Sequence, residues 1–180
     1  MKPTAIRLKS VKEYYFSRKL REVAELIKSG KDIINMGIGN PDLRPHPDVI
    51  KALYYAMQHP KANMYQSYQG LPELREAIVN FYKKFYKVTL DPNTEVLPLM
   101  GSKEGIMHLS MAYLNPGDQV LIPNPGYPTY ASVTRLLEAE TILYPLKPEN
   151  NWQPDFNTLE ALDTSRIKIM WLNYPHMPTG

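Results

Sequence analysis

Two short loops of this chain carry residue types that bind phosphate groups and planar rings. The first, Met100-Gly101-Ser102-Lys103-Glu104-Gly105, joins a predicted strand to a predicted helix. The first N–H groups of a helix have no partner and its dipole favours negative charge, so this loop is expected to bind an anion. Gly101 lets the backbone approach a phosphate, Ser102 offers a hydroxyl, and Lys103 adds a positive charge. The alternative is that Ser102 only caps the helix after a tight turn.

The second loop, Asn124-Pro125-Gly126-Tyr127-Pro128-Thr129-Tyr130, follows the next predicted strand. A tyrosine held on such a turn can stack on a planar heterocycle, which is worth about 0.5–1.5 kcal/mol beyond the area that it buries. The alternative is that Tyr127 packs over the edge of the sheet. A third aromatic loop contains Tyr65, Tyr68 and Gly70, and by itself it indicates no function.

The hydrophobic pattern predicts the elements that position these loops. Helices are predicted over 11–28, 48–59, 73–86, 102–114 and 127–138, with Pro47 and Pro72 where two of them begin. Strands are predicted over 33–36, 95–100, 119–123, 141–146 and 167–172, and 147–154 is predicted to be a loop. Strands that alternate with helices of about a dozen residues indicate an α/β fold, with a mostly parallel sheet and helices on both faces.

Composition excludes several classes of partner. The 21 basic and 18 acidic residues give a net charge of +3 without a run of like charges, so no nucleic acid is expected. The chain has no cysteine and four scattered histidines, so no metal site is expected. No apolar window approaches the roughly 20 residues of a membrane span. We therefore expect a cytoplasmic protein that binds small molecules.

The order of the motifs resembles that of a known family. They are Gly39-Asn40-Pro41-Asp42, Tyr65 with Gly70-Leu71-Pro72-Glu73-Leu74-Arg75, Gly101-Ser102-Lys103-Glu104-Gly105, Asn115-Pro116-Gly117-Asp118, Pro125-Gly126-Tyr127-Pro128 and Pro178-Thr179-Gly180. Together they resemble the N-terminal half of the class I/II pyridoxal-phosphate aminotransferases, enzymes of fold type I. The resemblance implies an N-terminal arm and part of the small domain over residues 1–45, and a truncated large, cofactor-binding domain over 46–180.

The resemblance also implies roles for single residues. Backbone around Gly101, Ser102 and Lys103 would hold the phosphate of pyridoxal 5′-phosphate, and Tyr127 would stack on its pyridine ring. Both roles agree with the anion site and the stacking tyrosine indicated by the residues themselves.

Two further roles would complete the site. Gly39 would lie beside the α-carboxylate of the substrate, and Tyr65 would reach the cofactor phosphate of a neighbouring subunit, which implies a homodimer. The Glu104-Gly105 form of the phosphate loop is similar to that of the diaminopimelate branch of the family.

This chain departs from the family pattern at Met177. The family has an asparagine there, whose amide bonds the phenolic oxygen of the cofactor, whereas a thioether is at best a weak acceptor. Met177 is counted among the cofactor-binding positions, and its side chain is expected to fill an apolar gap beneath the ring. Asn173 or a tyrosine from elsewhere could replace the missing donor.

A second departure concerns catalysis. In the family the Schiff-base lysine, the aspartate at the pyridine nitrogen and the arginine for the substrate carboxylate lie beyond the position of Gly180, so no catalytic residue is assigned. The resemblance implies a parent protein that transfers an amino group between an amino acid and a 2-oxo acid. We expect the 180-residue chain alone to be inactive and to associate through an exposed strand edge.

Other functions stay open at this point. The chain could be a non-catalytic module that binds phosphate ligands or pairs with another subunit, or part of a pyridoxal-phosphate lyase or decarboxylase of the same fold. A nucleotide-binding domain is disfavoured because the sequence has no GxGxxG motif.

Overall fold

The computed structural model describes residues 3–11, 13–37, 39 and 41–180. Its chain divides into two compact units, one of residues 1–13 and 99–180 and one of residues 14–98, and each is described separately below. The division into domains of residues 1–45 and 46–180 concerns the complete protein, and it stays a prediction.

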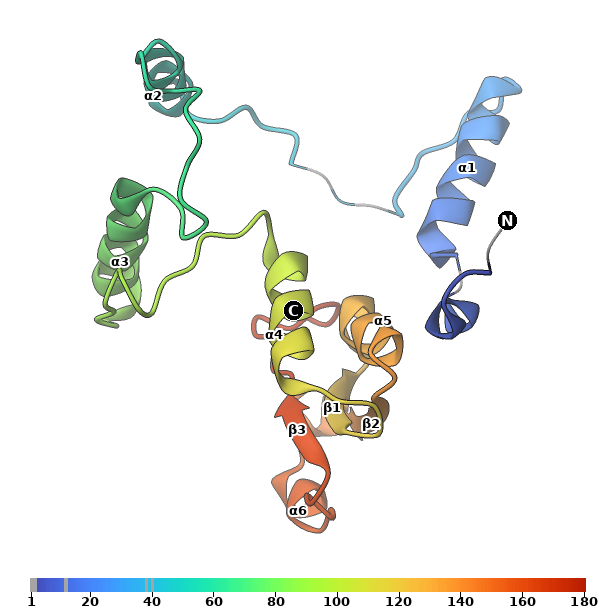
Figure 1. The fold of residues 1–180 in the computed structure, drawn as a ribbon. Helices are drawn as coiled ribbons and strands as arrows, with labels where there is room; N and C mark the ends of the chain where they lie inside the picture. Colours follow the sequence, from blue (N-terminus) through green and yellow to red (C-terminus); the bar gives the residue numbers. More distant parts are fainter. Residues whose placement is uncertain (1–2, 12, 38, 40) are drawn as a thin grey trace. The chain divides into compact units, whose positions relative to one another are not determined.

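A three-stranded parallel sheet forms the centre of the first unit (Figure 1). The central strand β1 (Gln119–Asn124) pairs with β2 (Glu140–Pro145) on one side and β3 (Ile167–Met170) on the other. Residues 120–123 of β1 are all buried, as expected for a parallel strand that is covered on both faces. The structure confirms the predicted α/β class and the parallel pairing.

Helices cover both faces of this sheet. Helices α4 (Ser102–Tyr113) and α5 (Pro128–Leu136) pack on one face. Its buried cluster consists of Ile106, Leu114, Val120, Ile122, Tyr130, Val133 and Ala139. On the other face the short helix α6 (Phe156–Glu160) contributes Leu159, which packs against a cluster of Leu121, Tyr144 and Leu146. Because successive strand residues point to opposite faces, Val120 and Leu121 belong to different clusters.

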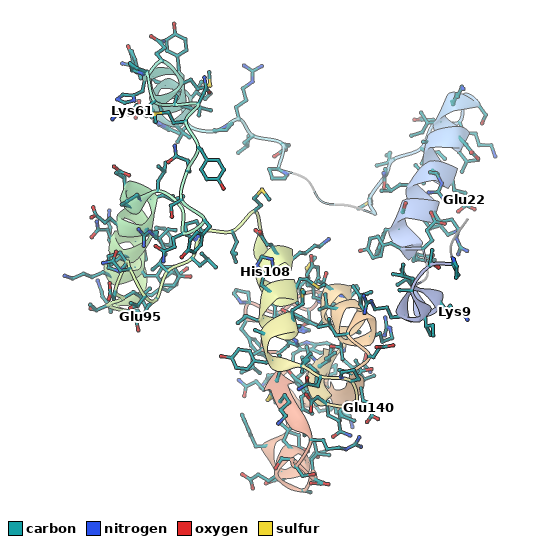
Figure 2. All side chains as sticks on the ribbon, viewed as in Figure 1. Lys9, Glu22, Lys61, Glu95, His108 and Glu140 are labelled. Carbon is teal, nitrogen blue, oxygen red and sulfur yellow. The ribbon has the colours of Figure 1, made fainter. Side chains whose placement is uncertain are left out.

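The second unit is helical. It contains α1 (Tyr15–Lys28), α2 (Pro47–Met57) and α3 (Pro72–Tyr86). Pro47 and Pro72 occupy the first positions of their helices, where the missing N–H has no partner to lose. Neither α1 nor α2 buries a described residue, and α3 buries only Arg75. Figure 2 shows the side chains of α2 and α3 standing out around each helix.

Two predicted strands are wrong. Residues 33–36 and 95–100 form no strand, and neither segment pairs with another part of the described chain. An apolar run becomes a strand only when a neighbour completes its backbone hydrogen bonds, and periodicity alone does not supply that neighbour. The sequence also gave no signal for the 3-10 helices η1 (Ile6–Ser10) and η2 (Pro148–Asn150) or for α6.

Candidate functional site

The predicted anion loop leads into an uncapped helix. Gly101 is the N-cap of α4, with φ 98° and ψ 160°, and the helix begins at Ser102 without a side-chain cap. The interpretation of Ser102 as an N-cap is therefore wrong, since the cap residue is a glycine and has no side-chain oxygen. The Glu104 N–H donates to the Gly101 carbonyl, and the N–H groups of Ser102 and Lys103 are left for an external acceptor, which is what an anion site requires.

Glu104 shapes this loop from within the first turn of α4. Its Oε2 accepts a hydrogen bond of 2.6 Å from the Met100 N–H, so the carboxylate reaches back across the loop. The bonded N–H belongs to Met100, the residue before the N-cap, so this contact differs from a capping box, in which the third helical side chain accepts from the N-cap N–H. A Cβ on Gly101 would have open space around it, so the backbone at the start of α4 is accessible.

Tyr127 lies at the carboxyl end of β1 and packs against other aromatic rings. It is half-buried and is the N-cap residue of α5. The Tyr127 and Tyr130 rings meet edge to face with centroids 5.7 Å apart, and Tyr130 stacks on Trp171 at 5.0 Å. Burial raises the pKa of Tyr130, with a smaller contribution from Tyr127. This packing holds Tyr127 in place while part of its ring stays accessible.

Gly126 permits the turn that carries Tyr127. A Cβ built on Gly126 would lie 2.2 Å from the carbonyl oxygen of Pro123, closer than any real contact of this kind. The position therefore requires glycine for space, whereas Gly101 requires it for its positive φ.

The structure brings the two predicted loops together. The Lys103 Nζ lies over the Tyr127 ring, 5.8 Å from its centroid. The residues come from the N-terminal ends of α4 and α5, two helices that pack against each other. The uncapped start of α4 and an accessible aromatic ring are thus neighbours in one unit.

The turn after β3 lies at the same edge of the sheet, because the three strands run parallel. Its Asn173 Oδ1 accepts a hydrogen bond of 3.2 Å from the Met177 N–H. Met177 is 57% exposed, and its expected place in an apolar gap beneath the cofactor ring stays a prediction. Asn173 uses its oxygen to close the turn, which leaves its NH₂ group as a donor.

Sequence reasoning missed two polar residues near this edge. His176 is buried, and its Nδ1 lies 2.6 Å from the Thr179 Oγ1, which ties the turn together. The Nε1 of Trp171 is buried and has no hydrogen-bond partner in the described chain. A Pro-rich turn gives no periodic signal for burial, so His176 could not be found from spacing, whereas Trp171 lies within the predicted strand 167–172.

Two predicted site residues belong to the other unit. Gly39 and Tyr65 lie within residues 14–98, and the Tyr65 side chain is fully exposed. Their roles toward the substrate and the neighbouring subunit stay predictions.

The charged groups at the other edge of the sheet belong to a solvated surface. At the opposite edge of the sheet Glu140, labelled in Figure 2, accepts hydrogen bonds from the Gln119 Nε2 and pairs with Arg166 at 3.2 Å. These contacts, the Gln119 hydrogen bond foremost, lower the pKa of Glu140. All three residues lie at the amino ends of the strands, away from the candidate site.

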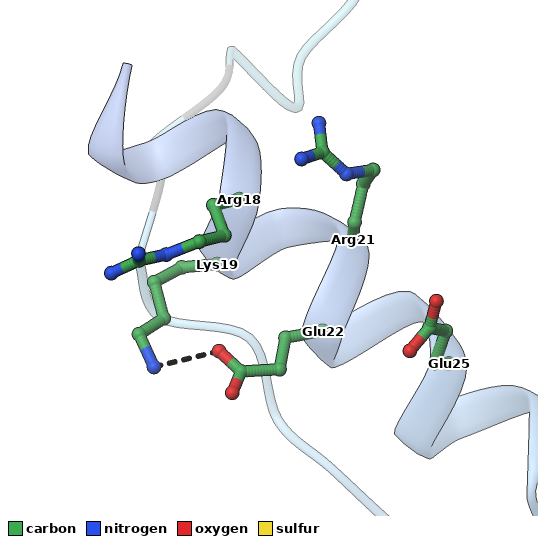
Figure 3. Close-up of a pocket in the computed structure, with 5 residues that line it drawn as sticks. All are labelled: Arg18, Lys19, Arg21, Glu22 and Glu25. Carbon is green, nitrogen blue, oxygen red and sulfur yellow. Dashed lines mark ion pairs between the residues drawn. The ribbon is translucent and has the colours of Figure 1, made fainter. Parts of the chain in front are cut away.

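A hollow on α1 is likewise a charged helix face. It has a volume of about 470 Å³ and is lined by Arg18, Lys19, Arg21, Glu22 and Glu25 (Figure 3). The Lys19–Glu22 pair, at 2.6 Å, is exposed on both sides, and such pairs contribute little to stability. None of the predicted site residues lines this hollow.

The described residues contain neither a membrane-spanning helix nor a cluster of metal ligands. No helix there has the length and apolar character needed to cross a bilayer. No group of three or more histidine or acidic side chains in that part of the chain is placed to hold a metal ion.

The residues at the candidate site fit pyridoxal 5′-phosphate. The uncapped start of α4 and the Lys103 ammonium match a phosphate dianion. The half-buried Tyr127 ring, supported by Tyr130, matches a planar pyridine ring.

Comparisons with known proteins agree with this fit. The family described as Aminotransferase class I and II matches residues 31–180. The chain is 42% identical over 174 residues to LL-diaminopimelate aminotransferase of Dehalococcoides mccartyi. The aligned part covers 97% of this chain and 45% of that protein. It is 43% identical over 173 residues to Transaminase BacF of Bacillus subtilis, with coverages of 96% and 43%.

Solved structures give the same result. The apo-BacF structure from Bacillus subtilis superposes with a TM-score of 0.91 at 41% identity, over 99% of this chain and 46% of that one. An alanine aminotransferase from Pyrococcus furiosus gives 0.89 at 31% identity, with coverages of 98% and 45%. The chain thus spans less than half the length of the relatives that it matches. With its parallel sheet, the uncapped start of its α4 and these matches, the chain belongs to the class I and II aminotransferases, whose cofactor is pyridoxal 5′-phosphate.

Proposed function

We propose that the protein is an aminotransferase that moves an amino group between an amino acid and a 2-oxo acid. The observation that carries this proposal is that the uncapped start of α4 lies beside Tyr127. The Lys103 Nζ is 5.8 Å from the centroid of the Tyr127 ring. The names of the relatives, all aminotransferases or transaminases among those reported above, support it. A lyase or decarboxylase activity and a non-catalytic phosphate-binding module have no comparable support.

The residues of the first unit would bind and orient the cofactor. The N–H groups at the start of α4, with Gly101, Ser102 and Lys103, hold the phosphate, and Tyr127 fixes the plane of the ring. The bound cofactor supplies a conjugated ring that accepts negative charge from the Cα of the amino acid. The side chains of this unit determine where that ring stands and which of its faces is covered.

Other positions complete the proposal. Gly39 would leave room for the substrate α-carboxylate, and Tyr65 would reach the cofactor phosphate of a second subunit in a homodimer. The Met177 side chain contributes no hydrogen-bond donor beside the ring. Asn173 carries the one side-chain amide of residues 173–180; its oxygen accepts the Met177 N–H, and its NH₂ group is left as the donor. Catalysis also needs a lysine that bonds to the cofactor, and no described residue is assigned that role.

The substrates are proposed only as classes. The relatives include LL-diaminopimelate aminotransferases and BacF at similar identity, so resemblance does not choose between their substrates. The Glu104-Gly105 form of the loop resembles that of the diaminopimelate and related branch, and the proposal names no substrate on that ground.

Titration with pyridoxal phosphate tests the cofactor role. We expect saturable binding, followed by absorbance, that inorganic phosphate competes away. Tyr127→Leu should weaken it about two- to twelvefold, since a stacked aromatic pair is worth about 0.5–1.5 kcal/mol. Tyr113→Leu, at an exposed tyrosine of α4, is the control. Binding that is unchanged in Tyr127→Leu would contradict the assigned stacking role.

Borohydride reduction and intact mass test the catalytic assignment. We expect no stoichiometric adduct on a single lysine of the 180-residue chain. A reduced adduct confined to one lysine of this chain would show that the covalent role does reside within it.

A further inference from the structure

Lys103 lies over the Tyr127 ring. The Lys103 Nζ stands 5.8 Å from the centre of the Tyr127 ring, within the range of a cation–π contact. Lys103 is exposed, while Tyr127 packs against the cluster that includes Tyr130. The ammonium therefore covers the ring from its solvent side.

This contact competes with the stacking of a ligand ring. Stacked aromatic rings have centroids about 4.5–7 Å apart, so a ring on this side of Tyr127 would occupy the place where the Nζ stands. Lys103 has to leave when such a ring binds. Among the described residues Lys103 forms no ion pair with a carboxylate, and the nearby Glu104 Oε2 accepts the Met100 N–H.

A phosphate on the ligand changes this balance. The start of α4 is one residue from Lys103, so a phosphate bound there gives the displaced ammonium a partner of opposite charge. A ring ligand without a phosphate breaks the cation–π contact and provides no negative charge to pair with the displaced ammonium.

We propose that Lys103 selects phosphorylated ring ligands by covering Tyr127 until a phosphate draws the ammonium away. The inference rests on the proposed cofactor site and goes beyond it, because it makes Lys103 an obstacle to one class of ligand as well as a partner of another. Selectivity of this kind depends on a penalty against the wrong ligand.

Binding of two vitamers without an aldehyde tests this proposal, because they form no covalent adduct with lysine. Pyridoxine and pyridoxine 5′-phosphate are titrated by calorimetry into the wild-type protein, Lys103→Gln and the control Lys168→Gln, which changes an exposed lysine of the same unit. In Lys103→Gln we expect pyridoxine to bind about two- to fivefold more tightly, as the loss of an exposed cation–π contact predicts. Pyridoxine 5′-phosphate should bind about tenfold more weakly.

The outcomes separate the two proposals. Suppose that Lys103→Gln binds pyridoxine 5′-phosphate more weakly and binds pyridoxine equally or more weakly. Lys103 is then only a phosphate partner, and this inference is wrong while the cofactor site stands. If the wild-type protein binds neither pyridoxine 5′-phosphate nor inorganic phosphate, the cofactor site is wrong and this inference fails with it.

A spectroscopic measurement tests the contact itself. The ε-methylene protons of Lys103, observed by NMR with labelled lysine, should be shifted upfield by the Tyr127 ring in the free protein. The shift should vanish in Tyr127→Leu and should decrease as inorganic phosphate saturates the site. Resonances that are unshifted in the free protein, or that phosphate leaves in place, would overturn the proposal.

Discussion

Gly101 and Gly126 both precede a site helix, yet they are glycines for different reasons. Gly101 has a φ of 98° and ψ of 160°, a region that other residues enter at a cost of about 1–3 kcal/mol, but a side chain there would meet open space. Gly126 has no positive φ, and a side chain there would meet the Pro123 carbonyl. The two positions should therefore respond differently to alanine.

Gly126→Ala is expected to destabilise the first unit by about 3 kcal/mol, at the upper end for overpacking, because the atom that it meets belongs to the backbone. Gly101→Ala should cost less stability and act mainly on phosphate affinity. Urea unfolding and phosphate titration of both variants measure the two effects. A larger loss of stability in Gly101→Ala than in Gly126→Ala would contradict this assignment.

Tyr144 is expected to make stability depend on alkaline pH. Its hydroxyl donates a 2.6 Å hydrogen bond to the Trp171 carbonyl, and burial, with a smaller contribution from Tyr174, raises its pKa from 10.0 to about 12. A raised folded-state pKa means that this stabilisation is complete below pH 10 and is lost as the pH rises through about 12.

Tyr144→Phe tests that expectation. At neutral pH it should lower the free energy of unfolding by about 1 kcal/mol through the lost hydrogen bond. Between pH 10 and 12 the difference from wild type should shrink, because the wild-type phenol then ionises more readily when unfolded. Tyr113→Phe, at an exposed hydroxyl, is the control, and an equal pH response in both variants would refute the role of Tyr144.

At the scale of elements, the sequence predicts a helix or strand well where the residues of one segment determine it, and poorly where a strand depends on a pairing partner. Proline at a first helical position predicted α2 and α3, and the apolar runs predicted β1, β2 and β3 in a parallel sheet. The segments 33–36 and 95–100 have similar apolar runs but pair with no described strand, so the sequence pattern overpredicted them.

The candidate site likewise has parts that one segment of the sequence predicts and parts that depend on contacts between segments. The anion loop and Tyr127 were predictable because each follows an apolar segment at a recognisable turn, and the structure places them together. The contact between Lys103 and Tyr127, the stacking of Tyr130 on Trp171 and the burial of His176 depend on how separate segments pack. No local spacing encodes such contacts.

Arg75 ties α3 to the loop that follows it. This buried side chain donates from its Nη1 to the Pro92 carbonyl at 3.0 Å, and it is the only described residue that α3 buries. Arg75→Ala should leave that carbonyl unpaired and loosen residues 87–98, with an opening free energy lower by about 1–3 kcal/mol. Hydrogen exchange of this loop measures the effect.

Lys84→Ala, at an exposed position of the same helix, is the matched control. Exchange in residues 119–124 of β1, which belong to the other unit, should be the same in both variants. Unaltered exchange of the 87–98 loop in Arg75→Ala would show that the tether does not hold it.

At the scale of the whole molecule, apolar surface is distributed unevenly between the two units. The sheet unit buries two clusters, whereas α2 exposes large side chains along its length. They are Val49, Ile50, Leu53, Tyr54, Tyr55 and Met57, each at least half exposed. In addition, β2 and β3 each have one side without a strand partner in the described chain. Exposed apolar faces and strand edges both favour association.

We therefore expect the 180-residue chain to associate as its concentration rises, as seen by light scattering, and we assign part of this association to α2. Leu53→Glu should lower the apparent mass without lowering the unfolding midpoint, because Leu53 is 61% exposed and lies in no buried cluster. Lys51→Gln is the matched control, since both substitutions change the formal net charge from +3 to +2. If Lys51→Gln reduced the mass as much as Leu53→Glu, charge would govern association. If neither variant reduced it, the strand edges of the sheet would be the remaining cause, and pairing at β3 would have to be tested by a proline at its exposed position Lys168.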